Sequence, residues 1–217
     1  SGSDRMASLH TKEGVRLTTV AEHADWVWSC AHRPGANMVA VGAGDGTVAM
    51  YTLSFAPIYA LHGERYAHRD LMTDVVVRHL PTLAVQLRLR CRHYIQRLAL
   101  YGSTLAVKLA NKVLVYELPP PLAAADGGDD EIPVAAPKPR HVLAGEHECD
   151  ELFLIAGHLL LCLGRIVKLV TFQGDVAREG LLDAAVACAH VVGGPVGTED
   201  VIVGLANGAV VQLFVDN

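Results

Sequence analysis

A short unit of two apolar stretches joined by a tight turn recurs along the chain, and no other feature restricts its fold as strongly. Each turn carries Gly, Asn or Asp, and the second stretch ends near an aromatic or His side chain. The intervals between successive turn markers are 41, 66, 54 and 42 residues. The first and last match the period of about 40–45 residues of a WD-type propeller blade. The repeat therefore predicts an all-β fold. The turn markers are Asp4, Asp45, Asn111, Arg165 and Asn207.

Four sets of three apolar strands extend this repeat, and we interpret each set as the inner part of one blade. We expect residues 1–217 to be part of one WD40-type β-propeller, with blades of four-stranded antiparallel sheet. The chain starts inside one blade, stops after the third strand of another and lacks an initial Met. Because propellers close with about four to eight blades, we expect a partial ring of about four to five blades from a longer ring. The strand sets are 26–32, 38–43 and 47–53; 95–101, 104–109 and 112–118; 151–156, 159–163 and 165–172; and 184–192, 201–205 and 209–215.

Two intervals exceed the period, and the extra residues can be located. Strands 74–80 and 84–91 flank a short turn, so we interpret residues 74–91 as an insertion, either an extra hairpin or the outer strand of a blade. The second excess is the segment 119–140, which holds six of the ten prolines and an acidic run at 126–131. Proline, glycine and like charges cannot bury a core, so we expect an acidic surface loop there. Its carboxylates do not have EF-hand spacing, so we expect no calcium site.

Composition and motifs exclude several classes of function. The chain is 51% hydrophobic and 19% charged, with a formal net charge of −5, unlike a disordered chain or a basic nucleic-acid binder. Its apolar runs are far shorter than the roughly 20 residues that span a bilayer, so we expect no transmembrane segment. The sequence has no catalytic elbow, Walker loop or metalloprotease motif, and its five cysteines include no C-x-x-C pair. We therefore expect no enzyme, no cofactor and no metal site.

Two polar residues occupy positions that have a structural role in WD repeats. The segment 22–30, followed by Gly-Asp-Gly-Thr at 44–47, has the order of such a repeat. In these repeats a His in the entry loop and an Asp in the turn after the second strand meet through hydrogen bonds, and His23 and Asp45 hold those positions. Tyr51 replaces the usual Trp and its indole N–H. We therefore expect an incomplete network that is structural and not catalytic.

Four arginines form the most notable charged feature. Arg88, Arg90 and Arg92 alternate along a predicted strand, so we expect them to share one face, with Arg97 close by in sequence. One interpretation is an ordinary solvated face. The other is a contact surface for an acidic partner or for anionic lipid head groups. Few aromatic side chains lie nearby, which disfavours binding of single-stranded nucleic acid.

Several strings resemble a known family of WD-repeat proteins. They include Trp-Val-Trp-Ser-Cys at 26–30 and Asp-Gly-Thr at 45–47, and the most specific are 65–70 with 72–75, and 192–195 through 214–217. The string at 65–75 is not a sequence feature common to WD repeats in general. The chain therefore resembles the second propeller of a WD-repeat subunit of intraflagellar transport complex A. The Pro-rich segment 119–140 departs from the family pattern.

This resemblance implies a function that the repeat period alone does not give. It implies a non-enzymatic scaffold, bound to other subunits of complex A and possessing no cofactor, in the cilium or flagellum, the basal body and the cytoplasm. It also implies a role in retrograde transport within cilia, in cilium assembly and in import of ciliary membrane proteins, with ciliary membrane cargo or adaptors as further partners. An alternative is a membrane-coat-like or adaptor propeller that binds short peptides or anionic lipid head groups.

Overall fold

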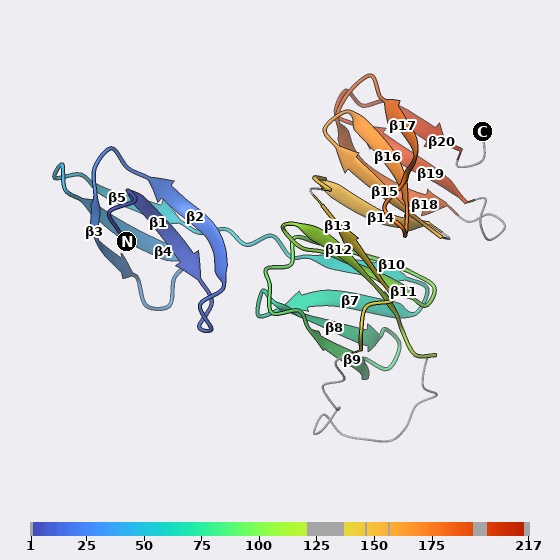
Figure 1. Cartoon of the computed structure of the whole chain (residues 1–217), viewed down its shortest axis with the longest axis horizontal. Helices are drawn as coiled ribbons and strands as arrows, with labels where there is room; N and C mark the ends of the chain where they lie inside the picture. Colours follow the sequence, from blue (N-terminus) through green and yellow to red (C-terminus); the bar gives the residue numbers. More distant parts are fainter. Residues whose placement is uncertain (1, 121–136, 146, 156, 193–198, 215–217) are drawn as a thin grey trace. The chain divides into compact units, whose positions relative to one another are not determined.

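The computed structural model describes residues 2–120, 137–145, 147–155, 157–192 and 199–214 (Figure 1). The chain divides into two compact units. Unit 1 comprises the residues up to Pro57 together with Arg92–Tyr94, and unit 2 comprises residues 58–91 and those from Ile95 onward. Every regular element among the described residues is a β-strand, and none of these residues forms a helix suited to crossing a membrane. The predicted all-β class is confirmed.

Unit 1 contains two antiparallel sheets. Strands β1 and β2 form a two-stranded sheet, and β3, β4 and β5 form a three-stranded one in chain order. The β4–β5 turn contains Gly46 with a φ of 86°, a left-handed conformation that glycine adopts at low steric cost. The strands are β1 (Met6–His10), β2 (Arg16–Glu22), β3 (Val27–His32), β4 (Met38–Ala43) and β5 (Val48–Thr52).

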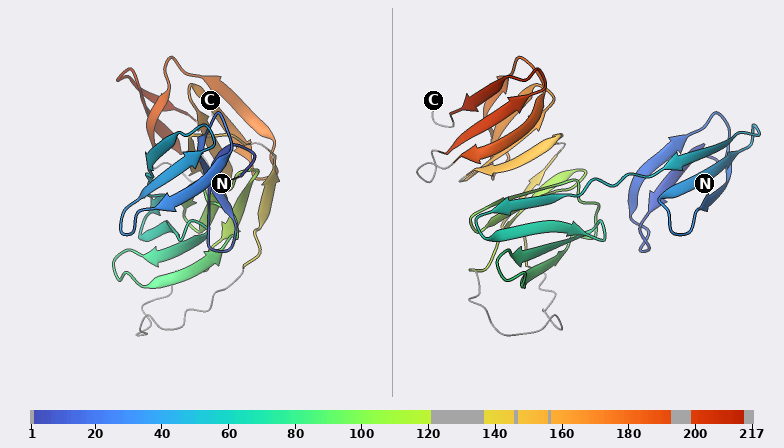
Figure 2. Two further views of the ribbon diagram at one scale, coloured as in Figure 1. Left: turned by 90° about the vertical axis from the view of Figure 1, so that its left-hand side faces the viewer. Right: turned by 180° about the vertical axis from the view of Figure 1, so that it is seen from behind.

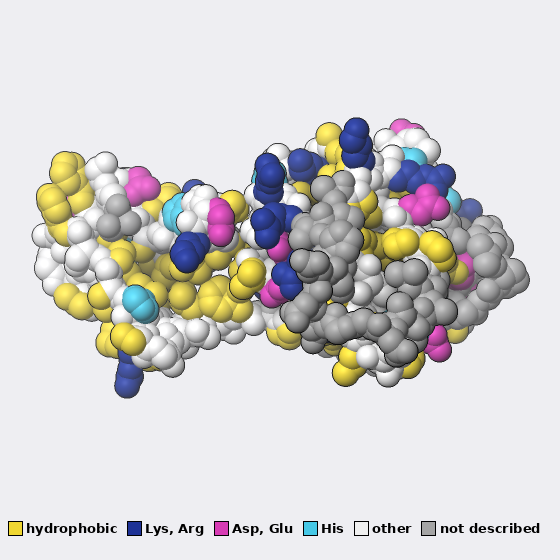
Figure 3. Space-filling model, turned by 90° about the horizontal axis from the view of Figure 1, so that it is seen from below, with side chains coloured by type: hydrophobic (Ala, Val, Ile, Leu, Met, Phe, Trp, Pro, Cys, Tyr) yellow, Lys and Arg dark blue, Asp and Glu magenta, His cyan; other side chains and the backbone are white. Residues whose placement is uncertain are grey.

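The core of unit 1 is small. It consists of Ala7, Val27 and Val41, with partly buried side chains packed around them. Successive side chains of a strand point to opposite faces, so one face of the three-stranded sheet covers this core. The other face leaves large side chains in solvent, with Trp28 69% and Met50 65% exposed. Much of the surface of unit 1 seen at the left of Figure 3 is accordingly hydrophobic.

Unit 2 contains four antiparallel sheets that follow one another in chain order (Figures 1 and 2). Three are four-stranded, namely β6–β9, β10–β13 and β14–β17, and the last, β18–β20, is three-stranded. The predicted four-stranded antiparallel sheets are therefore present. The strands are β6 (Tyr59–His62), β7 (Arg65–Asp70), β8 (Asp74–His79), β9 (Val85–Arg90), β10 (Arg97–Tyr101), β11 (Thr104–Lys108), β12 (Lys112–Glu117), β13 (His141–Ala144), β14 (Glu151–Ile155), β15 (His158–Leu163), β16 (Ile166–Thr171), β17 (Val176–Leu181), β18 (Val186–Val192), β19 (Asp200–Leu205) and β20 (Val210–Leu213).

Three apolar cores separate these four sheets. Strand β11 shows how they arise, because Leu105 and Val107 join the core toward β6–β9 while Ala106, between them, joins the core toward β14–β17. A third core lies between β14–β17 and β18–β20. The middle sheets are thus apolar on both faces. This explains why their strands read as nearly continuous hydrophobic runs in the sequence.

Residues 74–91 supply the third strand and the outer strand of one four-stranded sheet. They form β8 and β9, which pair with each other and, through β7, with β6 in a sheet of their own. The β7–β8 turn of this sheet carries Leu71 and Met72, where other sheets have Gly or Asn. The repeat pattern relies on Gly, Asn or Asp in the turn, so it did not identify this sheet. Unit 2 therefore contains one sheet more than the strand sets predicted for it.

The predicted acidic loop 119–140 lies mostly outside the described residues, which omit 121–136. The positions of its two ends are known, because the segment connects β12 to β13, the third and fourth strands of one sheet. The segment thus interrupts a blade between two paired strands. Its surface location remains a prediction.

Candidate functional site

Residues of the β6–β7 and β10–β11 turns meet a residue that lies just before β19 and form a polar cluster. The β10–β11 turn, at Tyr101 and Gly102, is its centre. The Tyr101 ring lies 4.6 Å, centroid to centroid, from the ring of His62 at the end of β6. Its hydroxyl donates a hydrogen bond to Glu199, just before β19. We call His62, Arg65, Tyr101 and Glu199 the turn cluster.

Burial and charge shape the titration of the turn cluster. Glu199 is only 1% exposed, and its hydrogen bond with Tyr101, aided by burial, raises the pKa of Tyr101 to about 12. His62 accepts a hydrogen bond at Nδ1 from the amide of Gly102, with 3.0 Å between the nitrogens. Burial lowers the pKa of His62, and the nearby charge of Glu199 acts in the opposite direction. The neutral forms of Tyr101 and His62 are therefore the ones that hold this turn.

Arg65 supplies a buried cation to the same place. It is 6% exposed, and its Nη1 donates to the carbonyl of Gly102 at 3.3 Å. Its Nη2 donates to the carbonyl of Pro119, just after β12. Burial lowers the pKa of Arg65. The guanidinium joins two chain segments of the neighbouring sheet through their backbone, so it acts as a structural clamp.

A cavity of about 270 Å³ lies beside the turn cluster, between the β10–β11 and β14–β15 turns. Four of its eight lining residues are aromatic or aliphatic, and three of the eight carry hydroxyl groups. Such a lining suits an apolar side chain of a partner. No group of metal-ligating side chains occurs among the residues that the structure describes. The lining residues are Tyr101, Gly102, Ser103, Thr104, Leu154, Ile155, Gly157 and Phe172.

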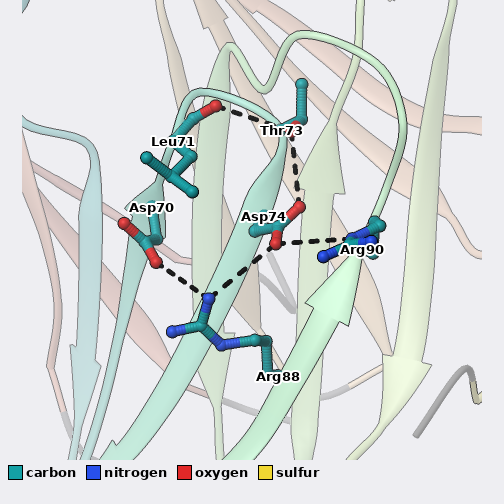
Figure 4. A network of polar contacts seen from close by, with 6 residues as sticks. All are labelled: Asp70, Leu71, Thr73, Asp74, Arg88 and Arg90. Carbon is teal, nitrogen blue, oxygen red and sulfur yellow. Dashed lines mark hydrogen bonds and ion pairs between the residues drawn. The ribbon is translucent and has the colours of Figure 1, made fainter. Parts of the chain in front are cut away.

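Two of the four predicted arginines face carboxylates of their own sheet (Figure 4). Arg88 Nη1 lies 3.1 Å from Asp70 Oδ2, and Arg90 Nε lies 3.7 Å from Asp74 Oδ2. Asp74 is 3% exposed, and its other oxygen accepts a hydrogen bond from the Thr73 hydroxyl at 3.3 Å. We call this set the Asp–Arg network. Because its charges compensate one another, a free anion would have to compete with Asp70 and Asp74.

The other two arginines do not extend this face. Strand β9 ends at Arg90, and Arg92 has a φ of 56°, so the alternation that was expected to align Arg92 with Arg88 and Arg90 stops before it. That part of the prediction is wrong. Arg97 begins β10, in another sheet. Its Nε donates to the carbonyl of Asp150, and its Nη1 donates to the carbonyl of Gln96 at 2.8 Å.

His23 and Asp45 both lie in unit 1. Asp45 accepts a hydrogen bond from the amide of Thr47 at 2.9 Å, which, as the largest cause, lowers the pKa of Asp45. The His23 ring meets the Tyr51 ring edge-on, with 6.1 Å between centroids. Its Nε2 is buried without a hydrogen-bond partner. Asp45 thus orders its own turn, and His23 packs against the residue that replaces the usual Trp.

Sequence reasoning missed the turn cluster. Tyr101 and Glu199 are 98 positions apart, and no motif joins them. Arg65 lies in the string 65–70, and Glu199 lies in the segment from 192 through 217, but both stretches were named only as marks of resemblance. A buried Glu or Arg carries no local signature, because its burial depends on which sheets pack together.

Antiparallel sheets packed face to face in chain order define a β-propeller-type repeat protein. Residues 59–217 match the family described as the IFT122 second beta-propeller. The chain therefore belongs to this family, and the resemblance found in its sequence is confirmed.

Curated relatives agree with this assignment. The whole chain aligns with the intraflagellar transport protein 122 homologs of Danio rerio, Mus musculus and Homo sapiens, at 39% identity over 216 residues in each case. It spans 17% of the length of these relatives. Among solved structures, Saccharomyces cerevisiae Sqt1 aligns with all of this chain and 68% of its own, at 13% identity and a TM-score of 0.48.

Proposed function

We propose that this chain is a non-enzymatic scaffold propeller of intraflagellar transport complex A. The observation that carries the proposal is the match of residues 59–217 to the second propeller of IFT122. The identity of 39% with relatives of that name supports it. The partners would be other subunits of the complex, and further partners would be ciliary membrane cargo or adaptors.

The physical character of unit 2 fits such a role. Its middle sheets are buried on both faces, so their turns and edges are what remains for partners to bind. Fold alone does not fix which turn is used. In this proposal the protein acts in the cilium or flagellum, the basal body and the cytoplasm. It supports retrograde transport, cilium assembly and import of ciliary membrane proteins.

The test is purification of the full-length protein, carrying an affinity tag at its native locus, from isolated cilia. We expect stoichiometric recovery of the other complex A subunits, stable in moderate salt. Leu105, which is fully buried, offers a disruptive variant. Leu105→Asp places a charge in the core and should abolish both this recovery and the return of transport trains from the ciliary tip.

Lys168→Ala is the matched control. Lys168 lies 3.4 Å from Glu179 in an exposed ion pair of the same unit, a type worth at most about 1 kcal/mol. This variant should behave as the wild type in both assays. Recovery of the wild-type protein without other subunits would overturn the proposal.

The alternative of an adaptor for short peptides or anionic lipid head groups has weaker support. It would rely on Arg88, Arg90 and Arg92, but the first two already face carboxylates. Charge reversal of all three, followed by flotation with vesicles containing phosphatidylserine, tests it. The alternative requires that the wild-type protein binds the vesicles and that the charge-reversed variant does not. The scaffold proposal expects that neither protein binds them.

A further inference from the structure

The β7–β8 turn has a backbone conformation that its residues do not favour. Leu71 has a φ of 46° and Met72 a φ of 67°, so two consecutive residues with side chains adopt the left-handed region. A Cβ atom makes this region sterically unfavourable, and glycine is the residue that adopts it most readily. The turn therefore holds strain that a glycine would remove.

The equivalent turns of the other sheets provide an internal comparison. The turn between the second and third strands contains Gly46 in unit 1 and Gly164 and Gly208 in unit 2, with φ values of 86°, 54° and 86°. The β11–β12 turn contains Ala110 and Asn111. Glycine thus supplies the left-handed residue at the corresponding connection in three of these sheets. The fold does not require a large side chain at this point.

Nothing in the described residues offsets this strain through packing of Leu71. Its side chain is 76% exposed. The backbone around it is nevertheless held firmly. The amide of Ile95 donates to the carbonyl of Met72 at 3.1 Å, and the amide of Cys91 to that of Thr73 at 3.0 Å. The Asp–Arg network fixes both strands that enter the turn (Figure 4).

An exposed apolar side chain on a strained but firmly held turn indicates a use outside the molecule. Strain of this kind persists where surrounding contacts impose it, and it is concentrated at functional sites. We propose that Leu71 docks into an apolar pocket on a partner protein. The partly exposed ion pair of Asp70 and Arg88, 34% and 35% exposed, would lie at the rim of that pocket and orient it. The proposal rests on the scaffold function and names one of its contacts.

A protein pocket fits this turn better than a membrane does. The carboxylate of Asp70 lies beside Leu71 and would be repelled by anionic head groups. Insertion into a bilayer would also remove the Asp–Arg network from water without providing new partners for it. A protein can supply polar groups at the rim of an apolar pocket, as interfaces commonly do.

The experiment compares three substitutions at position 71 of the full-length protein in its complex. Leu71→Gly removes the side chain and the strain at this one position. Leu71→Asn introduces a residue that tolerates the left-handed region, and Leu71→Met keeps an apolar side chain. We expect the Gly and Asn variants to melt no lower than the wild type and to weaken association with the complex by at least about tenfold, as loss of an interface anchor does. Leu71→Met should stay close to the wild type.

Leu83→Gly is the control within the same sheet. Leu83 is 62% exposed and has a φ of 57°, but it is a single left-handed residue in a short hairpin, a common arrangement. This variant should associate as the wild type does. Equal losses from Leu71→Gly and Leu83→Gly would overturn the proposal, because they would indicate a change in the sheet and not a contact at the turn.

A photoreactive diazirine analogue of leucine at position 71 identifies what the side chain touches. We expect a crosslink to apolar residues of one protein chain, lost when the mapped residue is changed to Asp. Crosslinks to lipid alone, or wild-type association of Leu71→Gly, would overturn the inference. If the wild-type protein does not purify with complex A subunits but position 71 still crosslinks to an apolar pocket of another protein, the scaffold assignment fails and the docking inference stands.

Discussion

Unit 1 and unit 2 use the same kind of strand but bury it differently. The middle sheets of unit 2 contribute apolar side chains to a core on each face. The three-stranded sheet of unit 1 covers a core of only three buried side chains on one face and leaves Trp28 and Met50 exposed on the other. Because buried apolar area is the main stabilising contribution to folding, unit 2 is expected to be far more stable than unit 1.

The largest test of this difference is a cavity in the middle of unit 2. Leu105→Ala removes a fully buried side chain and should lower the free energy of unfolding by about 2–5 kcal/mol, as such truncations do. Urea denaturation monitored by circular dichroism measures the change. Leu163→Ala, at a residue 37% exposed in the adjacent sheet, serves as the control, with a smaller expected loss. A loss below about 1 kcal/mol at Leu105 would show that this core is loosely packed.

The Asp–Arg network tests whether polar contacts add to the stability of unit 2. Asp74→Asn keeps the size of a side chain that is 3% exposed but removes the charge that faces Arg88 and Arg90. We expect a loss of about 1–3 kcal/mol in the free energy of unfolding, since a buried polar group loses its partners. Glu179→Gln, which breaks the exposed pair with Lys168, should cost less than about 1 kcal/mol. Equal effects of the two substitutions would argue against a special role for the network.

A matched cavity in unit 1 should have a smaller and more local effect. Val41→Ala truncates the only fully buried side chain of its small core and should cost about 1.5 kcal/mol, from about 0.8 kcal/mol for each methylene-sized group lost. Hydrogen exchange followed by mass spectrometry locates the effect. Amides of β3–β5 should exchange faster, while those of β10–β12 should not change. Acceleration in both units would mean that they unfold together.

The smallest expected effect is a pH dependence of unit 2. The pKa of Tyr101 is raised to about 12, above the ordinary value of about 10. The hydrogen bond to Glu199 therefore stabilises the fold fully below about pH 10, and this stabilisation is lost as the pH rises through about 12. Tyr101→Phe should remove about 1 kcal/mol at neutral pH. In strong alkali the wild type should lose its stability advantage over Tyr101→Phe.

Ultraviolet titration of tyrosinate, wild type minus Tyr101→Phe, isolates this group. The subtraction is needed because burial also raises the pKa of Tyr116 to about 12. A difference curve centred near pH 10 would contradict the hydrogen bond with Glu199.

The sequence predicted those sheets whose turns contain Gly or Asn, and it failed where the turn residues differ. The sheets beginning at β10, β14 and β18 were located because apolar runs alternate with turns at Asn111, Gly164 and Asn207–Gly208. The β6–β9 sheet was not recognised as one unit, because its β7–β8 turn contains Leu71 and Met72 instead of Gly, Asn or Asp. Only its last two strands were predicted, as the segment 74–91. Its strand β7 also carries Arg65 and other polar residues, so its pattern did not resemble a buried strand.

The site was less predictable than the fold. That Arg88 and Arg90 lie on one face follows from strand alternation, and both do reach toward Asp74. The carboxylates that neutralise them come from β7 and β8, so a count of arginines along one strand could not reveal them. The turn cluster depends on contacts between sheets, and no spacing within one strand encodes those.

The connection between β12 and β13 has a consequence for how the chain could be cut. Strand β13 is held by four pairs of facing residues with β12 and by Leu143, which is 2% exposed in the core toward β14–β17. Residues 121–136 lie in the sequence between these paired strands. A backbone break there would separate the chain into two pieces that still share a sheet. Those pieces are a natural pair for fragment complementation, in which the β10–β13 sheet is complete only when both pieces are present.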